Sequence, residues 1–234
     1  MKSIPVLALI LIALGAGMTC LSCVHFGSED TFSGRTVGKQ WDSAVAIQVS
    51  CLAGPTFGGS GVIIDDTHVL TAYHVVQENW DANRRKRDAD GNHIKEDWQH
   101  CNDQTIIIHE VDGSEHEVYV EKQSSSWDIA SLRLKTPGVK FSDKPPVFGP
   151  SPLLGEAVCV VSLLPDRWRR CGSAQPPNTG MIRADVTVEH GNSGSPVYDS
   201  AGRLVGIVTI QFKGEADQIM GMEAVALDSV PWIK

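Results

Sequence analysis

The chain has 234 residues and a formal net charge of −8, with 42% hydrophobic and 21% charged residues. This composition excludes a disordered or fibrous protein. The acidic balance disfavours a nucleic-acid partner, because binding phosphates needs a basic field. The 22 glycines and 12 prolines disfavour a helical bundle and are typical of many short strands joined by tight turns. The length suits a single unit built as two barrels or a sandwich.

The N-terminus predicts export. Lys2 precedes an apolar run over residues 4–18. The run is shorter than the roughly 20 residues of a membrane-spanning helix, but it matches the apolar core of a secretory signal. We therefore expect residues 1–22 to be a signal peptide or N-terminal anchor and residues 23–40 to be a linker. The protein would be periplasmic or extracellular, and membrane attachment through an uncleaved anchor or a lipidated cysteine stays an alternative.

Strand-like stretches, alternating or rich in β-branched residues, recur through the first half of the chain. They cover residues 43–51, 59–65, 68–72, 105–111, 117–121 and 129–134. Asp112-Gly113 predicts a hairpin between the fourth and fifth stretches. Residues 77–104 interrupt the series as a polar inserted loop. A calcium loop over residues 88–92 is rejected, because its glycine and the required glutamate are misplaced.

A second series follows a connector rich in proline and glycine, residues 136–149. Its strand-like stretches cover residues 157–162, 181–188, 197–198, 204–210 and 220–227. The chain thus shows two runs of about six strands joined by this connector, which predicts an all-β protein.

Four cysteines follow the signal region, and an even number in an oxidising compartment suggests disulfides. Cys159 and Cys171 flank a segment that is interpreted as a turn, residues 165–170, so this pair would close a hairpin. Cys51 and Cys101 would form the second pair. Buried free thiols remain the alternative for these positions.

Three motifs carry candidate catalytic chemistry: LTAYHVV at residues 70–76, WDIASL at 127–132 and GNSGSP at 191–196. A serine hydroxyl is a weak nucleophile near neutral pH and needs an adjacent base. A histidine can take and return a proton at that pH. An aspartate on the other ring nitrogen fixes the tautomer of the histidine. His74, Asp128 and Ser193 supply these groups.

Two rival hydrolases are disfavoured. An α/β-hydrolase places its histidine after the serine, but the last histidine of this chain is His190. A zinc hydrolase would need a motif such as His-Glu-x-x-His, which is absent, and His109 and His116 lie across an expected hairpin. No metal and no cofactor are therefore expected.

The motifs resemble those of the chymotrypsin-like (trypsin-fold) serine peptidases, and they are most similar to the bacterial branch of glutamyl endopeptidases and HtrA-type proteases. The resemblance covers residues 41–234. It implies an all-β fold of two six-stranded antiparallel β-barrels with the active site in the cleft between them, barrel 1 over about residues 41–135 and barrel 2 over about residues 147–227. It also implies a serine endopeptidase that acts through a His74–Asp128–Ser193 triad and an acyl-enzyme intermediate, and the N-terminal sequence adds export. The N–H groups of Gly191 and Ser193 would form the oxyanion hole, and Gly191 and Gly194 accept the dihedral angles of such a turn. An appended PDZ domain is not expected, because the chain ends soon after this motif.

The resemblance also places the substrate pocket. Thr187 would stand on one wall, where a trypsin-like cleft carries aspartate, so strict specificity for basic residues is not expected. Val208, Thr209 and Ile210 would form the opposite wall, and Val208 lies roughly where glutamate-specific relatives place a histidine. We expect a preference for small or medium apolar residues, and a role of His190 with acidic side chains stays open.

Asn192 replaces the aspartate that, in digestive relatives, pairs with a freshly cut N-terminus. A neutral amide cannot supply that charge, so activation of that type is not expected. The expected partner is a protein or peptide substrate of a monomeric enzyme. The alternative function is a catalytically inactive homologue that acts as a binding protein, and the intact set of His74, Asp128 and Ser193 argues against it.

Overall fold

The computed structural model describes residues 43–51, 56–77, 104–164, 167–176, 179–213 and 219–233. The expected signal and linker, Cys101 and nearly all of the inserted loop lie outside these ranges, as does the side chain of Cys51. The predictions for these regions therefore stay predictions. No helix within the described residues is long and apolar enough to cross a bilayer.

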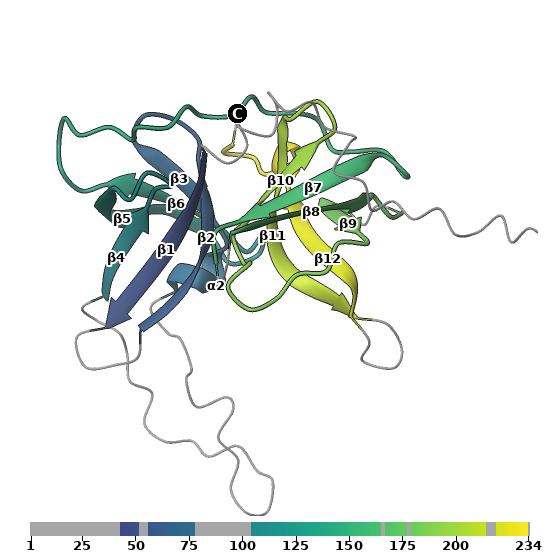
Figure 1. Cartoon of the computed structure of the whole chain (residues 1–234), viewed down its shortest axis with the longest axis horizontal. Coiled ribbons are helices and arrows are strands. Elements are labelled where there is room, and N and C mark those ends of the chain that lie inside the picture. The colour runs from purple at the N-terminus through teal and green to yellow at the C-terminus, as the bar shows by residue number, and fades with distance from the viewer. Residues whose placement is uncertain are drawn as a thin grey trace, which may run out of the picture.

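Barrel 1 is a closed barrel with the strand order β1-β2-β3-β6-β5-β4, the blue and teal half of Figure 1. Its alternating sequence explains which side chains fill it: in β1, Val45, Ile47 and Val49 are buried in the core while Gln48 is exposed. One helical turn, α2, follows β3. The elements are β1 (Ala44–Cys51), β2 (Thr56–Ile63), β3 (His68–Thr71), α2 (Tyr73–Val76), β4 (Gln104–His109), β5 (Glu115–Ser124) and β6 (Ile129–Leu134).

Barrel 2 is a six-stranded antiparallel sheet with the order β8-β7-β10-β11-β12-β9. No strand ladder joins its two edge strands in the described residues; an isolated bridge between Ala174 and Ala184 links them instead. The elements are β7 (Ala157–Ser162), β8 (Trp168–Ser173), β9 (Met181–Ala184), β10 (Pro196–Asp199), β11 (Leu204–Lys213), β12 (Ile219–Ala226) and the 3-10 turn η3 (Leu227–Ser229).

The expected fold of two six-stranded antiparallel barrels is confirmed, with two corrections in barrel 2. Residues 165–170 are not simply a turn, because Trp168–Ser173 forms β8. The arginines of this stretch interrupt the apolar alternation that would predict a strand. An edge strand tolerates such polar residues because one of its sides has no neighbouring strand. The strand expected over residues 181–188 ends at Ala184, where Asp185 leaves the ladder with β12.

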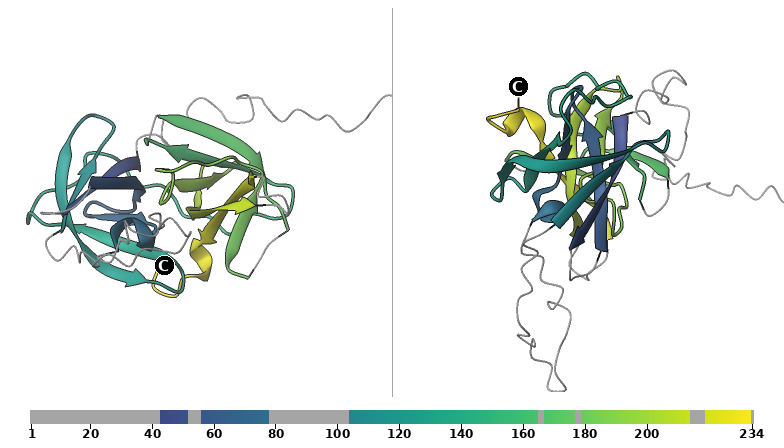
Figure 2. Two further views of the ribbon diagram at one scale, coloured as in Figure 1. Left: turned by 90° about the horizontal axis from the view of Figure 1, so that it is seen from below. Right: turned by 90° about the vertical axis from the view of Figure 1, so that its left-hand side faces the viewer.

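The two barrels lie side by side (Figure 2) and share a third apolar cluster at their junction. Leu70 and Ile129 of barrel 1 pack in this cluster with Tyr198 and Ile207 of barrel 2. The buried Tyr198 hydroxyl also lies 2.8 Å from the hydroxyl of Ser43, just before β1. The junction is therefore an extended part of the core, and it fixes the barrels relative to one another.

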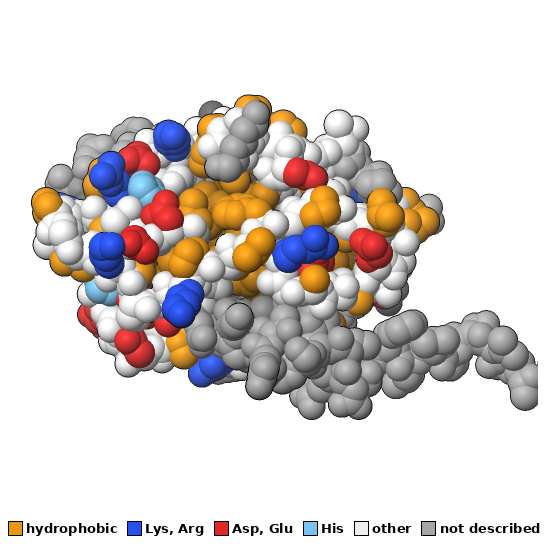
Figure 3. Space-filling view, turned by 90° about the horizontal axis from the view of Figure 1, so that it is seen from above, with side chains coloured by type: hydrophobic (Ala, Val, Ile, Leu, Met, Phe, Trp, Pro, Cys, Tyr) orange, Lys and Arg blue, Asp and Glu red, His pale blue; other side chains and the backbone are white. Residues whose placement is uncertain are grey.

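The connector between β6 and β7 crosses the molecule at the top of Figure 1, away from α2. The buried Glu110 carboxylate ties its start to barrel 1 by accepting the Ser142 N–H at 3.1 Å and the Ser142 hydroxyl at 2.8 Å. Four large apolar side chains on the connector are exposed, and Figure 3 shows apolar side chains around a hollow on this face. The four exposed side chains of the connector are Val147, Phe148, Leu153 and Leu154.

Candidate active site

The side chains of His74 and Asp128 meet on the barrel 1 side of the junction. His74 lies in α2, which the buried Val75 and Val76 anchor in the barrel 1 core. Nδ1 of His74 lies 2.8 Å from Oδ2 of Asp128, and the backbone N–H of His74 donates to Oδ1 at 3.0 Å. The carboxylate therefore holds both the backbone and the ring of His74, and it favours the tautomer with the proton on Nδ1.

The backbone at Asp128 is unusual, because its φ of 49° lies in the left-handed region. Aspartate tolerates this region better than most residues. The Asp128 carbonyl accepts the N–H of Tyr73 at 3.1 Å, which ties the turn to α2. On the other side, Trp127 packs so closely on Gly180 of barrel 2 that a Cβ there would lie 2.4 Å from the ring. The surroundings on both sides thus hold the turn that aims Asp128 at His74.

Ser193 lies in a turn that precedes β10 of barrel 2, and Ser60 of β2 in barrel 1 holds its backbone. The Ser60 N–H donates to the Ser193 carbonyl at 2.8 Å, and the Ser60 hydroxyl donates to the Gly191 carbonyl at 3.0 Å. Gly194 has a φ of 85°, and a Cβ there would lie 1.9 Å from the Ser60 carbonyl oxygen. Only glycine fits at this position without a shift of the backbone.

The turn at Ser193 and helix α2 meet at one point of β2. A Cβ on Gly59 would lie 2.7 Å from the Val75 methyl groups and 2.9 Å from the Ser193 carbonyl oxygen. His74 and Ser193 are therefore brought to the same junction from sequence positions far apart. Within the described residues no hydrogen bond joins the Ser193 hydroxyl to His74, and such bonds often tighten only when substrate binds.

Two backbone donors of the turn at Ser193 have no acceptor among the described residues. These are the N–H groups of Gly191, at a φ of 95°, and of Ser193 itself. The N–H of Asn192 between them is engaged, because it donates to the Glu189 carbonyl at 3.1 Å. Preorganised donors of this kind can stabilise the negative oxygen of a tetrahedral intermediate.

The buried side chain of Asn192 is held entirely by polar neighbours of barrel 2. Its Nδ2 donates to the Ser162 hydroxyl at 3.0 Å and to the Leu164 carbonyl at 2.6 Å. Its Oδ1 accepts the Glu189 N–H at 2.6 Å. The amide is thus hydrogen-bonded at both ends without any charged partner, which suits a neutral side chain at this position.

The four expected pocket residues lie on two segments beside the turn. Thr187 is exposed, and its carbonyl accepts a hydrogen bond from Arg170 at 3.0 Å. Val208 packs in the barrel 2 core, while its backbone carbonyl accepts the Gly194 N–H at 2.8 Å. Thr209 is buried, and Ile210 pairs through its backbone with β12. Segments 185–190 and β11 therefore flank the Ser193 turn.

Two other kinds of binding site can be looked for in the described residues: a metal centre and a pocket. No group of three or more histidine, cysteine, aspartate or glutamate residues in the described part of the chain could hold a metal ion. His109 instead pairs with Glu115, and His116 with Glu110. A pocket of about 350 Å³ between β9, η3 and the connector contains none of the candidate catalytic residues.

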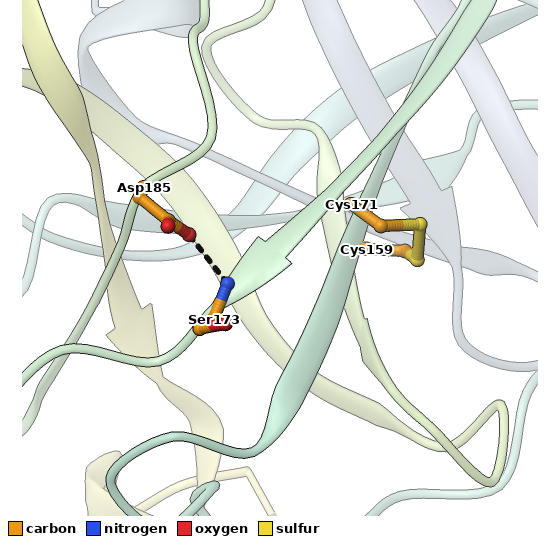
Figure 4. The surroundings of a disulfide bond; sticks show 4 residues. All are labelled: Cys159, Cys171, Ser173 and Asp185. Atoms are coloured by element: carbon orange, nitrogen blue, oxygen red, sulfur yellow. Dashed lines mark hydrogen bonds between the residues drawn. A yellow bond between two sulfur atoms is a disulfide. The ribbon is translucent and has the colours of Figure 1, made fainter. Parts of the chain in front are cut away.

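Cys159 and Cys171 form a disulfide between directly opposite positions of β7 and β8 (Figure 4). The expected pair is thus present, and it closes the hairpin of β7 and β8 as predicted. The predicted pair of Cys51 and Cys101 lies outside the described residues.

Sequence reasoning missed several residues that hold the site, above all Ser60, Ser162 and Arg170. The available signal was the Gly59-Ser60-Gly61 sequence, because glycines within a strand mark a close approach of another segment. Which segment approaches is a tertiary fact. Arg170 carried no signal at all in a stretch that was interpreted as a turn.

A His–Asp pair on one barrel and a glycine-flanked serine on the other is the arrangement typical of serine peptidases of the trypsin fold. Residues 59–207, well over half of the chain, match the family model of the trypsin-like peptidase domain. The chain belongs to this family.

Solved structures share the fold. The serine endoprotease from Yersinia pestis superimposes with a TM-score of 0.59 at 20% identity, over 82% of this chain and 61% of that chain. This chain therefore spans less than two thirds of that relative. Deg5 superimposes with a TM-score of 0.60 at 20% identity, over 83% of this chain and 88% of its own. A search of curated proteins found no similar sequence.

Proposed function

We propose that this protein is an exported serine endopeptidase that cleaves peptide bonds through Ser193, His74 and Asp128. One observation carries the proposal. His74 on α2 pairs with Asp128 in the turn before β6, and α2 and the turn at Ser193 meet at β2. The Ser193 turn also carries two backbone N–H donors that have no acceptor among the described residues. Export rests on the sequence of residues 1–22.

The chemistry follows from these positions. His74, with its proton on Nδ1 facing Asp128, leaves Nε2 to take the proton of the Ser193 hydroxyl as Oγ attacks the scissile carbonyl. The negative oxygen of the tetrahedral intermediate accepts hydrogen bonds from Gly191 and Ser193. The imidazolium then returns its proton to the leaving amine, and an acyl-enzyme remains. Water repeats the sequence and releases the acid.

The same geometry supports the narrower proposals on specificity and activation. Thr187 supplies no charge to the pocket, which favours small or medium apolar residues before the scissile bond. The bonds that hold the Asn192 amide lie wholly within barrel 2, so extra N-terminal residues should not block activity. A peptide-library profile dominated by Arg, Lys or Glu would contradict the first statement. Inactivity until one trimming event would contradict the second.

Covalent labelling tests the proposal most directly. The protein should react with a fluorophosphonate at Ser193 and hydrolyse a peptide substrate, and Ser193→Ala should abolish both. Ser195→Ala is the matched control, because its buried hydroxyl has no hydrogen-bond partner among the described residues and should be dispensable. A folded wild-type protein that neither labels nor hydrolyses peptides would favour the binding-protein alternative.

A further inference from the structure

The segment that leads to Ser193 runs beside the edge strand β8. The Ser173 N–H donates to the Asp185 carboxylate, as Figure 4 shows, and the Asp185 N–H donates back to the Ser173 carbonyl at 3.3 Å. Gly172 lies against the same carboxylate, since a Cβ there would lie 2.3 Å from Oδ1 of Asp185. β8 therefore serves as the support along which residues 185–189 approach the site.

Arg170 makes a further contact between β8 and this segment. Its Nη1 donates to the Thr187 carbonyl at 3.0 Å and lies 3.2 Å from Oε1 of Glu189. The guanidinium carbon also lies 4.6 Å from the centre of the Trp168 ring. A cation held over an aromatic face keeps a defined direction, so Trp168 orients Arg170 toward both acceptors.

Glu189 transmits this contact to the turn at Ser193. Its backbone carbonyl accepts the Asn192 N–H at 3.1 Å, and its backbone N–H donates to the Asn192 side chain at 2.6 Å. Asn192 lies directly between Gly191 and Ser193, whose N–H groups are the two free donors. A continuous series of contacts thus runs from the Arg170 guanidinium to the proposed oxyanion hole.

We propose that Arg170 is a positioning residue that holds the Glu189–Asn192 turn so that the N–H groups of Gly191 and Ser193 point at the developing oxyanion. This inference rests on the proposed peptidase function and extends it to a residue outside the catalytic groups. Arginine suits the position because its planar guanidinium can stack on the aromatic ring while it donates to the two acceptors, and an ammonium group has no planar face for such stacking.

The effect should appear in catalysis and not in stability. The side chains of Arg170 and Glu189 are 42% and 56% exposed, and such pairs contribute little to folding. Displacing a catalytic donor by a fraction of an ångström, however, lowers the turnover rate, because the donor must meet the oxygen in the transition state.

The first experiment compares Arg170→Ala with Arg133→Ala. Arg133 on β6 has a side chain of similar exposure, 48%, and an ion pair with Glu121 at 2.9 Å, but it lies on barrel 1. Arg170→Ala should lower kcat about tenfold with little change in KM, while Arg133→Ala leaves both unchanged. Both variants should keep Tm within about 4 °C of the wild type.

A double-mutant cycle separates positioning from a general structural role. If Arg170 acts through Glu189, then Glu189→Ala should lower kcat as Arg170→Ala does, and the double variant should lose little more. Arg170→Lys should restore only part of the loss. A peptide aldehyde, whose hemiacetal oxygen occupies the oxyanion hole, should lose affinity for Arg170→Ala by about the same factor as kcat.

An active wild-type enzyme whose kcat is unaffected by Arg170→Ala would overturn this inference alone. A loss confined to KM, or losses that multiply in the double variant, would overturn it as well. A wild-type protein that neither labels nor hydrolyses peptides would overturn the proposed function and this inference together.

Discussion

The two barrels hold their share of the candidate site by different means. Barrel 1 is closed by strand ladders all the way round, and its His74–Asp128 pair lies in two short turns anchored in that closed core. Barrel 2 is an open sheet whose edges meet at one isolated bridge. Its turn at Ser193 depends on bonds from Ser60, Asn192 and Val208.

This difference explains how each barrel fixes the positions of its candidate catalytic groups. A closed ladder satisfies its own backbone groups, so barrel 1 needs only one carboxylate to fix the histidine. The turn in barrel 2 carries two unengaged N–H groups. Side chains and a disulfide must therefore supply the order that the backbone ladder does not. We expect variants of the His74–Asp128 pair to lose chemistry alone. Variants that break buried contacts of barrel 2 or of the junction should lose stability as well, unlike variants of the exposed Arg170–Glu189 pair.

We expect the largest effect from a substitution that removes only the contribution of barrel 1 to the candidate site. Asp128→Asn should keep the fold, because asparagine also accepts the positive φ of this position. Its amide would face Nδ1 of His74, leave the proton on Nε2 and so remove the base for Ser193. We expect kcat to fall by about 10⁴-fold with an unchanged urea midpoint.

The control for this prediction is Asp112→Asn on the β4–β5 turn. Asp112 accepts the Ser114 N–H at 2.8 Å, which an asparagine oxygen can also do, so activity should remain. A variant of Asp128 that keeps more than a tenth of wild-type kcat would contradict the role of its carboxylate.

Gly194→Ala tests the junction between the barrels. The new methyl group would meet the Ser60 carbonyl oxygen at 1.9 Å at a φ of 85°, so we expect a loss of about 3 kcal/mol or more in the free energy of unfolding. Activity should fall with it, since the Ser193 backbone must move.

Gly113→Ala is the matched control for Gly194. Gly113 has a φ of 91°, but no atom lies within 4 Å of the place that a methyl group would take there. The substitution should cost only the backbone strain, about 1–2 kcal/mol. Equal urea midpoints for the two variants would show that the contact with Ser60 does not matter.

The disulfide tests barrel 2 separately. Replacing Cys159 and Cys171 by alanine removes a link across 12 residues, and we expect a loss of about 2–3 kcal/mol in unfolding free energy. The wild type should lose similar stability in dithiothreitol, whereas the variant should not respond to the reductant. If the wild type and the variant give identical urea unfolding curves with and without dithiothreitol, the disulfide does not stabilise the fold.

The smallest expected effect concerns the buried phenol at the junction. Burial raises the pKa of Tyr198, and the hydrogen bond with Ser43 offsets this only in part. The neutral phenol is the folded form, so its contribution to stability is complete below the ordinary tyrosine pKa of about 10 and is lost as the pH rises above it. At pH 11 we expect a loss of about 1 kcal/mol.

Unfolding curves at pH 8 and pH 11 would measure this effect. Tyr198→Phe should be less stable at pH 8, because it loses the bond with Ser43, but it should lose less on going to pH 11. Tyr119→Phe serves as the control, since that ring is 43% exposed. An alkaline loss that persists undiminished in Tyr198→Phe would place its origin elsewhere.

Much of the fold and the candidate catalytic groups could be predicted from the sequence. The alternation of apolar and polar residues in β1 and the run of β-branched residues in β4 directly indicate strands with a buried face. The three motifs each combine a reactive side chain with a local turn, so their chemistry is visible without the fold. β8 escaped prediction because Arg169 and Arg170 remove the apolar pattern from an open edge.

The amino-acid sequence by itself determined most of the strand series and the residues of the candidate triad. Those features arise from local periodicity and side-chain chemistry, which do not need long-range contacts. Only the tertiary structure decided that Ser60 holds the Ser193 turn, that Asn192 is satisfied within barrel 2, and that Arg170 reaches Glu189. Each of these depends on segments far apart in the chain meeting at hydrogen-bond distance, and the packing of the two barrels fixes that geometry.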